Sequence, residues 1–222
     1  MPGNPYYLVP RYYVEEAPQS DSEAALVRDA KFISIGDLAS SGVLDIRKGN
    51  EVGSEAYGTG DIPFVRTSDI SNFEISTDPT KSVSDEIYER FSGHQRLRPG
   101  SILMVVDGRY RIGATAVITA RTVRSVVQSH VKIIDVAPDS RVDPYAVLFS
   151  LSLPSVRRRI RDLVFVQSTL GTLGKRLLEL KLPALWTPGP WSTRVELFRN
   201  TLRERDRLLG ELSAQAQADV EL

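Results

Sequence analysis

The stretch LRPGSILMVVDGRYRIGATAV, residues 97–117, decides the fold. Its Pro-Gly turn directly precedes ILMVV, so we expect a strand to start there. Every residue of ILMVV is apolar, which indicates a strand that is covered on both faces. The run breaks at Asp107-Gly108, where Gly108 suits a tight turn that β-branched neighbours could not adopt. Two more β-branched runs, 112–119 and 126–136, predict that the middle of the chain is a sheet.

Helices flank this predicted sheet on both sides along the chain. A short helix is expected over 33–44, ended by Gly42, and Ser84 is placed to cap another that reaches Phe91. A glycine-containing loop is expected over 49–60 and a short strand over 61–65. After the sheet, helices are predicted to open at Asp143-Pro144 and at Pro154. The fold class is therefore α+β, with a twisted sheet and flanking helices.

The chain divides into three predicted parts. Residues 1–30 are rich in proline and tyrosine and then acidic, which is typical of an extended leader or linker; 31–186 form a single domain; 191–222 form a C-terminal helix. The apolar residues of that helix follow the spacing of a coiled-coil seam interrupted by Arg205: Val195, Phe198, Leu202, Leu209 and Leu212. Because about three heptads are marginal for an isolated coil, we expect the helix to pack on a partner or on its own domain.

Composition sets broad limits. The chain has 222 residues, 41% of them hydrophobic and 25% charged, which is an ordinary globular balance. It contains no cysteine, which excludes disulfides, thiolate metal sites and cysteine nucleophiles. No apolar run reaches about 18 residues and no secretion signal opens the chain, so we expect a soluble cytoplasmic protein without membrane contact.

The formal net charge of zero hides a strong asymmetry along the chain. Ten acids and four bases lie between residues 15 and 61, whereas seven bases and only Asp107 lie between 96 and 132. Seven more bases and two acids lie between 155 and 181. Two basic stretches in a neutral chain favour a surface that faces a polyanion, although solvated arginines are an equal alternative.

Signatures of catalysis are missing from the sequence. His94 and His130 are far apart and belong to no zinc or hydrolase motif. Gly174-Lys175 lacks the remaining residues of a nucleotide-binding loop. A metal-dependent nuclease needs clustered carboxylates, and the nearest fragment is Asp45 with Lys48. We therefore expect no enzyme activity, no metal and no cofactor on this chain.

Polar groups that can contact nucleic acid gather in four short segments at the ends of apolar strands. Each segment has an alternative explanation as a local turn that satisfies its own backbone. The candidate DNA-contacting residues are Arg66, Thr67, Ser68 and Asp69; Asp107, Arg109, Tyr110 and Arg111; Gln128, Ser129 and His130; and Gln167, Ser168, Thr169, Lys175 and Arg176. Gln128 and His130 are predicted to share one face of a strand, with Ser129 on the other.

The stretch GDIPFVRTSDIS, residues 60–71, resembles the target recognition domains of type I restriction-modification specificity subunits. Residues 97–117 are similar to the family's "lkpGDil…dG…iG" region, VVQSHVKII (126–134) to its next strand, and FVQSTLGTLGKRLLELKLPAL (165–185) to its closing element. The ordered set covers residues 32–185. The C-terminal recognition domain of a related adenine DNA methyltransferase would look equivalent.

The resemblance implies a non-catalytic module that reads half of a split sequence in double-stranded DNA while a partner methylates an adenine. S-adenosylmethionine would then bind the methyltransferase subunit or domain. A restriction subunit, and a second copy of the chain through the C-terminal helix, are further implied partners. The chain would be a half-subunit that dimerises or one part of a longer methyltransferase. The alternatives are a protein-interaction adaptor with the same fold and, less favoured, a metal-dependent nuclease.

Overall fold

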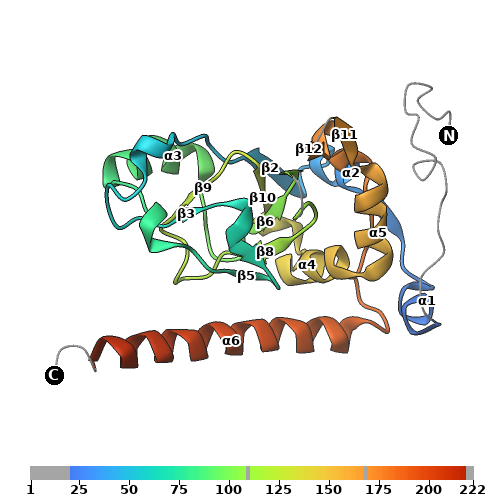
Figure 1. Ribbon diagram of the computed structural model, residues 1–222. Helices are drawn as coiled ribbons and strands as arrows, with labels where there is room; N and C mark the ends of the chain where they lie inside the picture. The colour runs from blue at the N-terminus through green and yellow to red at the C-terminus, as the bar shows by residue number, and fades with distance from the viewer. Residues whose placement is uncertain (1–20, 109–110, 168–169, 219–222) are drawn as a thin grey trace.

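The structure, a computed structural model, describes residues 21–108, 111–167 and 170–218 (Figure 1). Its α-helices are α1 (Asp21–Val27), α2 (Ile35–Ser40), α3 (Asp85–Gln95), α4 (Pro144–Ser152), α5 (Pro154–Leu163) and α6 (Ser192–Ala218). Short 3-10 helices are η2 (Ser54–Ala56), η3 (Thr67–Asp69), η4 (Pro79–Lys81), η5 (Pro138–Ser140) and η6 (Gly174–Glu179). The predicted α+β class is confirmed.

In the described part of the chain the strands form five small sheets. The largest has the order β2-β10-β6-β8, and the others are β11-β12-β7, β1-β13, β3-β9 and β4-β5. Their strands are β1 (Phe32–Ser34), β2 (Leu44–Lys48), β3 (Phe64–Val65), β4 (Ile70–Ser71), β5 (Glu74–Ile75), β6 (Ile102–Val105), β7 (Asp107–Gly108), β8 (Thr115–Val117), β9 (Val126–Val127), β10 (Val131–Val136), β11 (Phe165–Gln167), β12 (Leu170–Thr172) and β13 (Lys181–Pro183).

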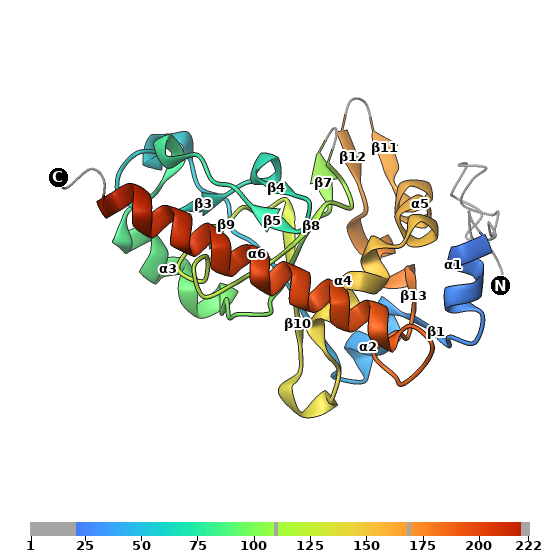
Figure 2. The same ribbon diagram turned by 90° about the horizontal axis from the view of Figure 1, so that it is seen from below.

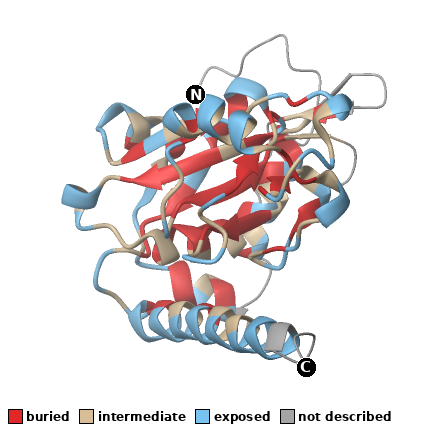
Figure 3. Cartoon of the chain, turned by 90° about the vertical axis from the view of Figure 1, so that its left-hand side faces the viewer, coloured by how far each residue is buried: buried red, intermediate tan, exposed pale blue. Residues whose placement is uncertain are grey.

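Strand β6 lies at the centre of the largest sheet, as the apolar run predicts. It pairs antiparallel with β10 on one side and with β8 on the other. All four of its residues are buried: Ile102 and Met104 belong to one core cluster, Leu103 and Val105 to another. Since side chains alternate along a strand, both faces of β6 are covered. Figure 3 shows buried strands at the centre of the molecule.

The two helix starts that were predicted from a capping side chain, at Ser84 and at Asp143, are confirmed. Ser84 Oγ accepts a hydrogen bond from Ile87 N at the start of α3, and Asp143 Oδ1 accepts one from Tyr145 N at the start of α4. Helix α3 continues to Gln95, four residues beyond the predicted end. The following Arg96 takes a left-handed conformation with φ 45° and ends the helix.

Four predicted boundaries are wrong because strand pairing and turns outweigh local pattern. The strand expected over 61–65 is reduced to β3. The helix expected over 33–44 is reduced to α2, since Ile33 pairs with Leu182 in β1–β13 and Leu44 with Val136 in β2–β10. The strand expected over 112–119 is reduced to β8. The strand expected over 126–136 is split into β9 and β10 by the turn at 128–130.

The predicted leader is also partly wrong. Residues 1–20 lie outside the described part of the chain, but α1 follows them and is anchored. Leu26 and Val27 are buried in the main core cluster. Glu23 Oε1 accepts hydrogen bonds from Ser155 N and Oγ at the start of α5. The end of the acidic stretch therefore belongs to the folded body.

The C-terminal helix α6 begins at Ser192, one residue after the predicted start at 191, and runs along one side of the domain (Figure 1). Val195 and Leu202 are buried in the main core cluster. The Phe198 ring lies edge-on against Phe73, with centroids 5.1 Å apart. Arg205, which interrupts the apolar seam, donates hydrogen bonds to the carbonyl of Phe73 at 3.1 Å and to that of the preceding residue at 2.8 Å.

This packing corrects the prediction that the whole apolar seam binds a partner. Val195, Phe198 and Leu202 pack on their own domain, which was the stated alternative. Leu209 faces the same side and is half-buried beside Leu202. Leu212 is 67% exposed and is the one residue of the predicted seam that remains open. None of the helices in the described ranges combines the length and apolar character needed to cross a bilayer.

Candidate nucleic-acid interface

Two of the polar segments leave the same edge of a parallel strand pair. Strands β3 and β9 pair in parallel, with Val65 opposite Val127. Their carboxyl ends therefore point the same way, and segments 66–69 and 128–130 follow directly. The Thr67 backbone N–H donates a hydrogen bond to Gln128 Oε1 at 3.2 Å. Segments distant in the sequence are thus joined at this edge.

The segment at β7 lies against the same edge. Val106 N donates a hydrogen bond to the His130 carbonyl at 3.0 Å, and Asp107 Oδ2 lies 3.7 Å from His130 Nδ1. Arg111 Nη1 donates to the carbonyl of Ile70, just beyond the first segment, at 3.0 Å. Gly108 has φ 133°, which supports the predicted need for glycine at this break.

The fourth segment is a hairpin that pairs with β7. Strands β11 and β12 pair antiparallel, and β12 continues to β7 with Gly171 opposite Gly108 and Thr172 opposite Asp107. Thr172 Oγ1 also donates a hydrogen bond to the Asp107 carboxylate. Figure 2 shows β7, β12 and β11 side by side, next to α5. Of the predicted contacts, Arg109, Tyr110, Ser168, Thr169 and the Gln167 side chain lie outside what the structure describes.

In the first segment, residues 66–69, Asp69 forms a local turn with its neighbours, which is the alternative that the sequence analysis gave for this segment. The Asp69 carboxylate is 6% exposed and accepts hydrogen bonds from Arg66 N, Nε and Nη2 and from Ser68 Oγ. Arg66 Nη2 also lies 3.6 Å from Asp78 Oδ2. Both partners of this pair are therefore engaged within the fold. Thr67 is half-buried and Ser68 is exposed.

Two other predicted DNA contacts are buried. Ser129 donates a hydrogen bond to the Glu51 carboxylate. Arg176 Nη1 donates to the Leu163 carbonyl at 2.9 Å, which holds η6 against the end of α5. These side chains, like Asp69, are not available to a ligand, so we withdraw them from the predicted contacts. Gln128 is half-buried and His130 is exposed, but residues 129–130 form a turn and not the strand on which the shared face was predicted.

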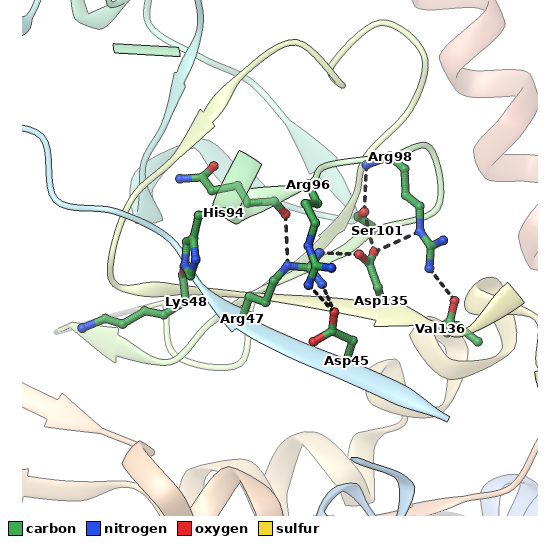
Figure 4. A network of polar contacts seen from close by, with 10 residues as sticks. Asp45, Arg47, Lys48, His94, Arg96, Arg98, Ser101, Asp135 and Val136 are labelled. Atoms are coloured by element: carbon green, nitrogen blue, oxygen red, sulfur yellow. Dashed lines mark hydrogen bonds and ion pairs between the residues drawn. The ribbon is translucent and has the colours of Figure 1, made fainter. Parts of the chain in front are cut away.

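Four arginines of the 96–132 basic stretch form ion pairs with carboxylates of the same chain while their side chains stay partly exposed, which corrects the idea that the whole stretch is free to face a polyanion. Figure 4 shows one such network around Asp135, which is 5% exposed. Asp135 accepts a hydrogen bond from Ser101 Oγ at 2.6 Å and pairs with Arg47 and Arg98. The four ion pairs of this stretch are Arg96–Asp45, Arg98–Asp135, Arg121–Asp206 and Arg124–Asp85.

Six bases that have no acidic partner among the described residues line two hollows near β7. One hollow, of about 390 Å³, is lined by Lys48, Lys132 and Lys175 together with Asp107. The other, of about 480 Å³, is lined by Arg111 and by two arginines of α5, Arg157 and Arg161. Three of the predicted residues thus line these hollows: Asp107, Arg111 and the exposed Lys175.

The sequence prediction of the site missed Lys48, Lys132, Arg157 and Arg161. Three of them lie in the basic stretches, so regional charge was the available signal. Lys48 lies in the acidic stretch, and only the pairing of β2 with β10 brings it beside Lys132.

The sequence prediction also missed Gln95. This residue holds strand β9 in place at the candidate interface, but its own side chain is buried and cannot contact a ligand. The side chain is 1% exposed at the end of α3. Its Nε2 donates to Asn50 Oδ1 at 2.8 Å and to the Val127 carbonyl at 3.0 Å, while Oε1 accepts from Val127 N at 2.8 Å. One carboxamide thereby satisfies both backbone groups of Val127 and fixes the strand that leads into Gln128.

No family model matches the chain, and no curated protein matches it in sequence. Among solved structures, the S subunit of a type I restriction-modification system from M. genitalium matches with a TM-score of 0.51 and 16% identity, over 84% of this chain and 42% of that one. The two chains share a fold. This confirms, for the fold, the resemblance stated from residues 32–185.

Two further solved chains match at lower TM-scores. The HsdS subunit from Thermoanaerobacter tengcongensis has a TM-score of 0.45 and 17% identity, over 85% of this chain and 39% of that one. A chain from a structure on complex assembly and conformational transition of the type I R-M system has a TM-score of 0.44 and 17% identity. The match covers 90% of this chain and 47% of that one. This chain spans less than half the length of each of the three.

Among the residues that the structure describes, no group of three or more histidine, aspartate or glutamate side chains is placed to hold a metal ion.

Proposed function

We propose that this chain recognises a specific sequence in double-stranded DNA as one recognition half of a specificity subunit. The observation that carries the proposal is the convergence of the four polar segments on one edge, next to two hollows lined by bases that have no acidic partner in the described part of the chain. The shared fold with a type I S subunit supports it. Recognition, rather than catalysis, is the role proposed.

The described groups at the edge suit a division between base and phosphate contacts. Gln128 offers an amide, which pairs with adenine, and Ser68 offers a hydroxyl that can reach either kind of base pair. His130 adds an exposed imidazole. Arg111 lies where the edge meets the hollow lined by α5 and can reach guanine or phosphate. We therefore expect sequence to be read by Gln128, Ser68 and His130.

Selection from a random duplex library, followed by binding measurements on the enriched sequence, tests the proposal. We expect one enriched motif and an affinity that falls steeply between about 50 and 200 mM salt. Gln128→Ala should weaken binding to that motif by about 1–3 kcal/mol and relax preference at one position. Gln215→Ala, on the exposed surface of α6, is the matched control and should change nothing.

An adaptor without a DNA role would behave differently. It would enrich no motif, and its contacts with a protein partner would respond little to salt. That outcome would refute DNA recognition and favour the adaptor, whereas divalent-dependent cleavage by the chain alone would favour a nuclease.

We further propose that the chain directs an adenine DNA methyltransferase subunit or domain, which would bind S-adenosylmethionine. A restriction subunit and a second copy of this chain are additional proposed partners. Methylome sequencing of the host with and without the gene tests this role. Loss of one adenine-methylation motif would support it and reveal the target, and an unchanged methylome would refute it.

A further inference from the structure

Lys48 and Lys132 oppose each other across two paired strands. In the β2–β10 register Lys132 is directly opposite Lys48. Directly opposed side chains lie on the same face of an antiparallel pair, and like charges in that position destabilise it. The pKa of Lys132 is held below its ordinary value, first by burial and then by Lys48. The two ammonium groups therefore repel each other across the strand pair, and this repulsion does not stabilise the sheet.

A third ammonium group adds to this charge. Lys175, in η6, lines the same hollow of about 390 Å³. The carboxylate on its wall is Asp107, which accepts a hydrogen bond from Thr172 and lies 3.7 Å from His130 Nδ1. Among the described residues, none of the three lysines forms an ion pair with a carboxylate.

The neighbouring arginines show the contrast. Arg47 lies next to Lys48 in β2, and its guanidinium is buried between Asp45 and Asp135, which neutralise it (Figure 4). The fold thus places carboxylates around bases that hold the structure together. Among the described residues, Asp107 is the one carboxylate that lines the lysine hollow, so the three lysines leave an excess of positive charge that a bound anion would balance.

We propose that Lys48, Lys132 and Lys175 bind a phosphate group of the DNA backbone and hold the duplex in register whatever its sequence. This inference rests on the proposed DNA recognition. Lysine suits phosphate because it acts as a point charge with three donors. The site shares Asp107 with the edge that carries His130, so a phosphate bound there places the neighbouring bases beside that edge.

The test uses Lys48→Gln, Lys132→Gln and Lys175→Gln in the full chain. Lys31→Gln, which removes an exposed lysine before β1, is the matched control. Affinity is measured for a random-sequence duplex and for a duplex enriched from the library, across a salt series. Each hollow variant should weaken both duplexes by the same factor, about 3–10-fold, and reduce the salt slope by about 1, while the control changes neither.

A second arm measures the melting temperature Tm. Because Lys48→Gln and Lys132→Gln relieve repulsion, Tm should stay the same or rise. Inorganic phosphate, compared with chloride at equal ionic strength, should raise Tm of the wild type more than that of either variant.

Three results would overturn the inference: unchanged affinity and salt slope in all three variants, a loss confined to the enriched duplex, or a lower Tm with unchanged affinity. A wild type that binds neither duplex would instead refute the proposed function. The Tm response to inorganic phosphate would then decide the anion site separately, because that readout needs no DNA.

Discussion

Truncation of Leu202 tests whether α6 is docked on its own domain. Leu202 is 7% exposed, while Leu212, ten residues later on the same helix, is 67% exposed. Leu202→Ala and Leu212→Ala remove the same atoms and change helix propensity equally. The difference between the two variants therefore isolates the contribution of docking.

The magnitude follows from burial. Burying a leucine side chain stabilises by about 1.5–3 kcal/mol, and the cavity left by truncation brings the loss to about 3 kcal/mol. A void of about 20 Å³ already borders Leu202 between α6 and β5, so truncation enlarges an existing gap. Leu212→Ala should change the free energy of unfolding by less than about 0.5 kcal/mol.

Urea denaturation followed by tryptophan fluorescence measures both variants. Trp186 and Trp191 are the two tryptophans of the chain, and Trp191 is buried just before α6. With a urea dependence of about 2–3 kcal/mol per molar, Leu202→Ala should lower the midpoint by about 1 M. Equal midpoints for the two variants would refute the docked position of α6.

Three further predictions concern the interface and its support. Gln95→Leu leaves the Val127 N–H unpaired, while Asn50 N still donates to the Val127 carbonyl at 2.8 Å, and it should lower the free energy of unfolding by about 1–3 kcal/mol in urea; an unchanged stability would contradict the bridging role. Asp69→Asn should cost about 1.5–3 kcal/mol, and a double-mutant cycle with Arg66→Ala should show coupling; additive effects would mean that the pair is not formed. The pKa of Lys132 is lowered from 10.5 by burial and Lys48 against the opposing effect of Asp107, so the unfolded state binds more protons between the folded pKa and 10.5. Stability should therefore rise with pH in that window, and Lys132→Gln should reduce the rise; an identical pH profile for the two proteins would contradict it.

Local patterns were informative wherever a residue acts on its immediate neighbours. Ser84 and Asp143 cap helices because their side chains reach N–H groups two or three residues away. Gly108 takes a positive φ because the break in the apolar run needs one. Where strands decide a boundary, as at Ile33 and Leu44, the partner lies far along the chain, and the local pattern failed.

The candidate site shows the same limit. The polar segments were found because each directly follows or begins at an apolar strand. Asp69 is engaged by its neighbours Arg66 and Ser68, as the alternative of a local turn predicted. The engagement of Ser129 and Arg176 was not predictable, since their partners Glu51 and Leu163 are brought near only by folding. Regional charge counted Arg96 and Arg98 as free bases, but Asp45 and Asp135 neutralise them across the sheet.

The sequence by itself determined the central strand, the α+β class, the helix caps and the four segments that carry polar groups. These features depend on the alternation, spacing and capping of residues that are close together in the sequence. Only the tertiary structure decided which charges remain without a partner. Lys48 belongs to an acidic stretch, yet the antiparallel register sets it against Lys132, because strand pairing brings together charges that the chain keeps far apart.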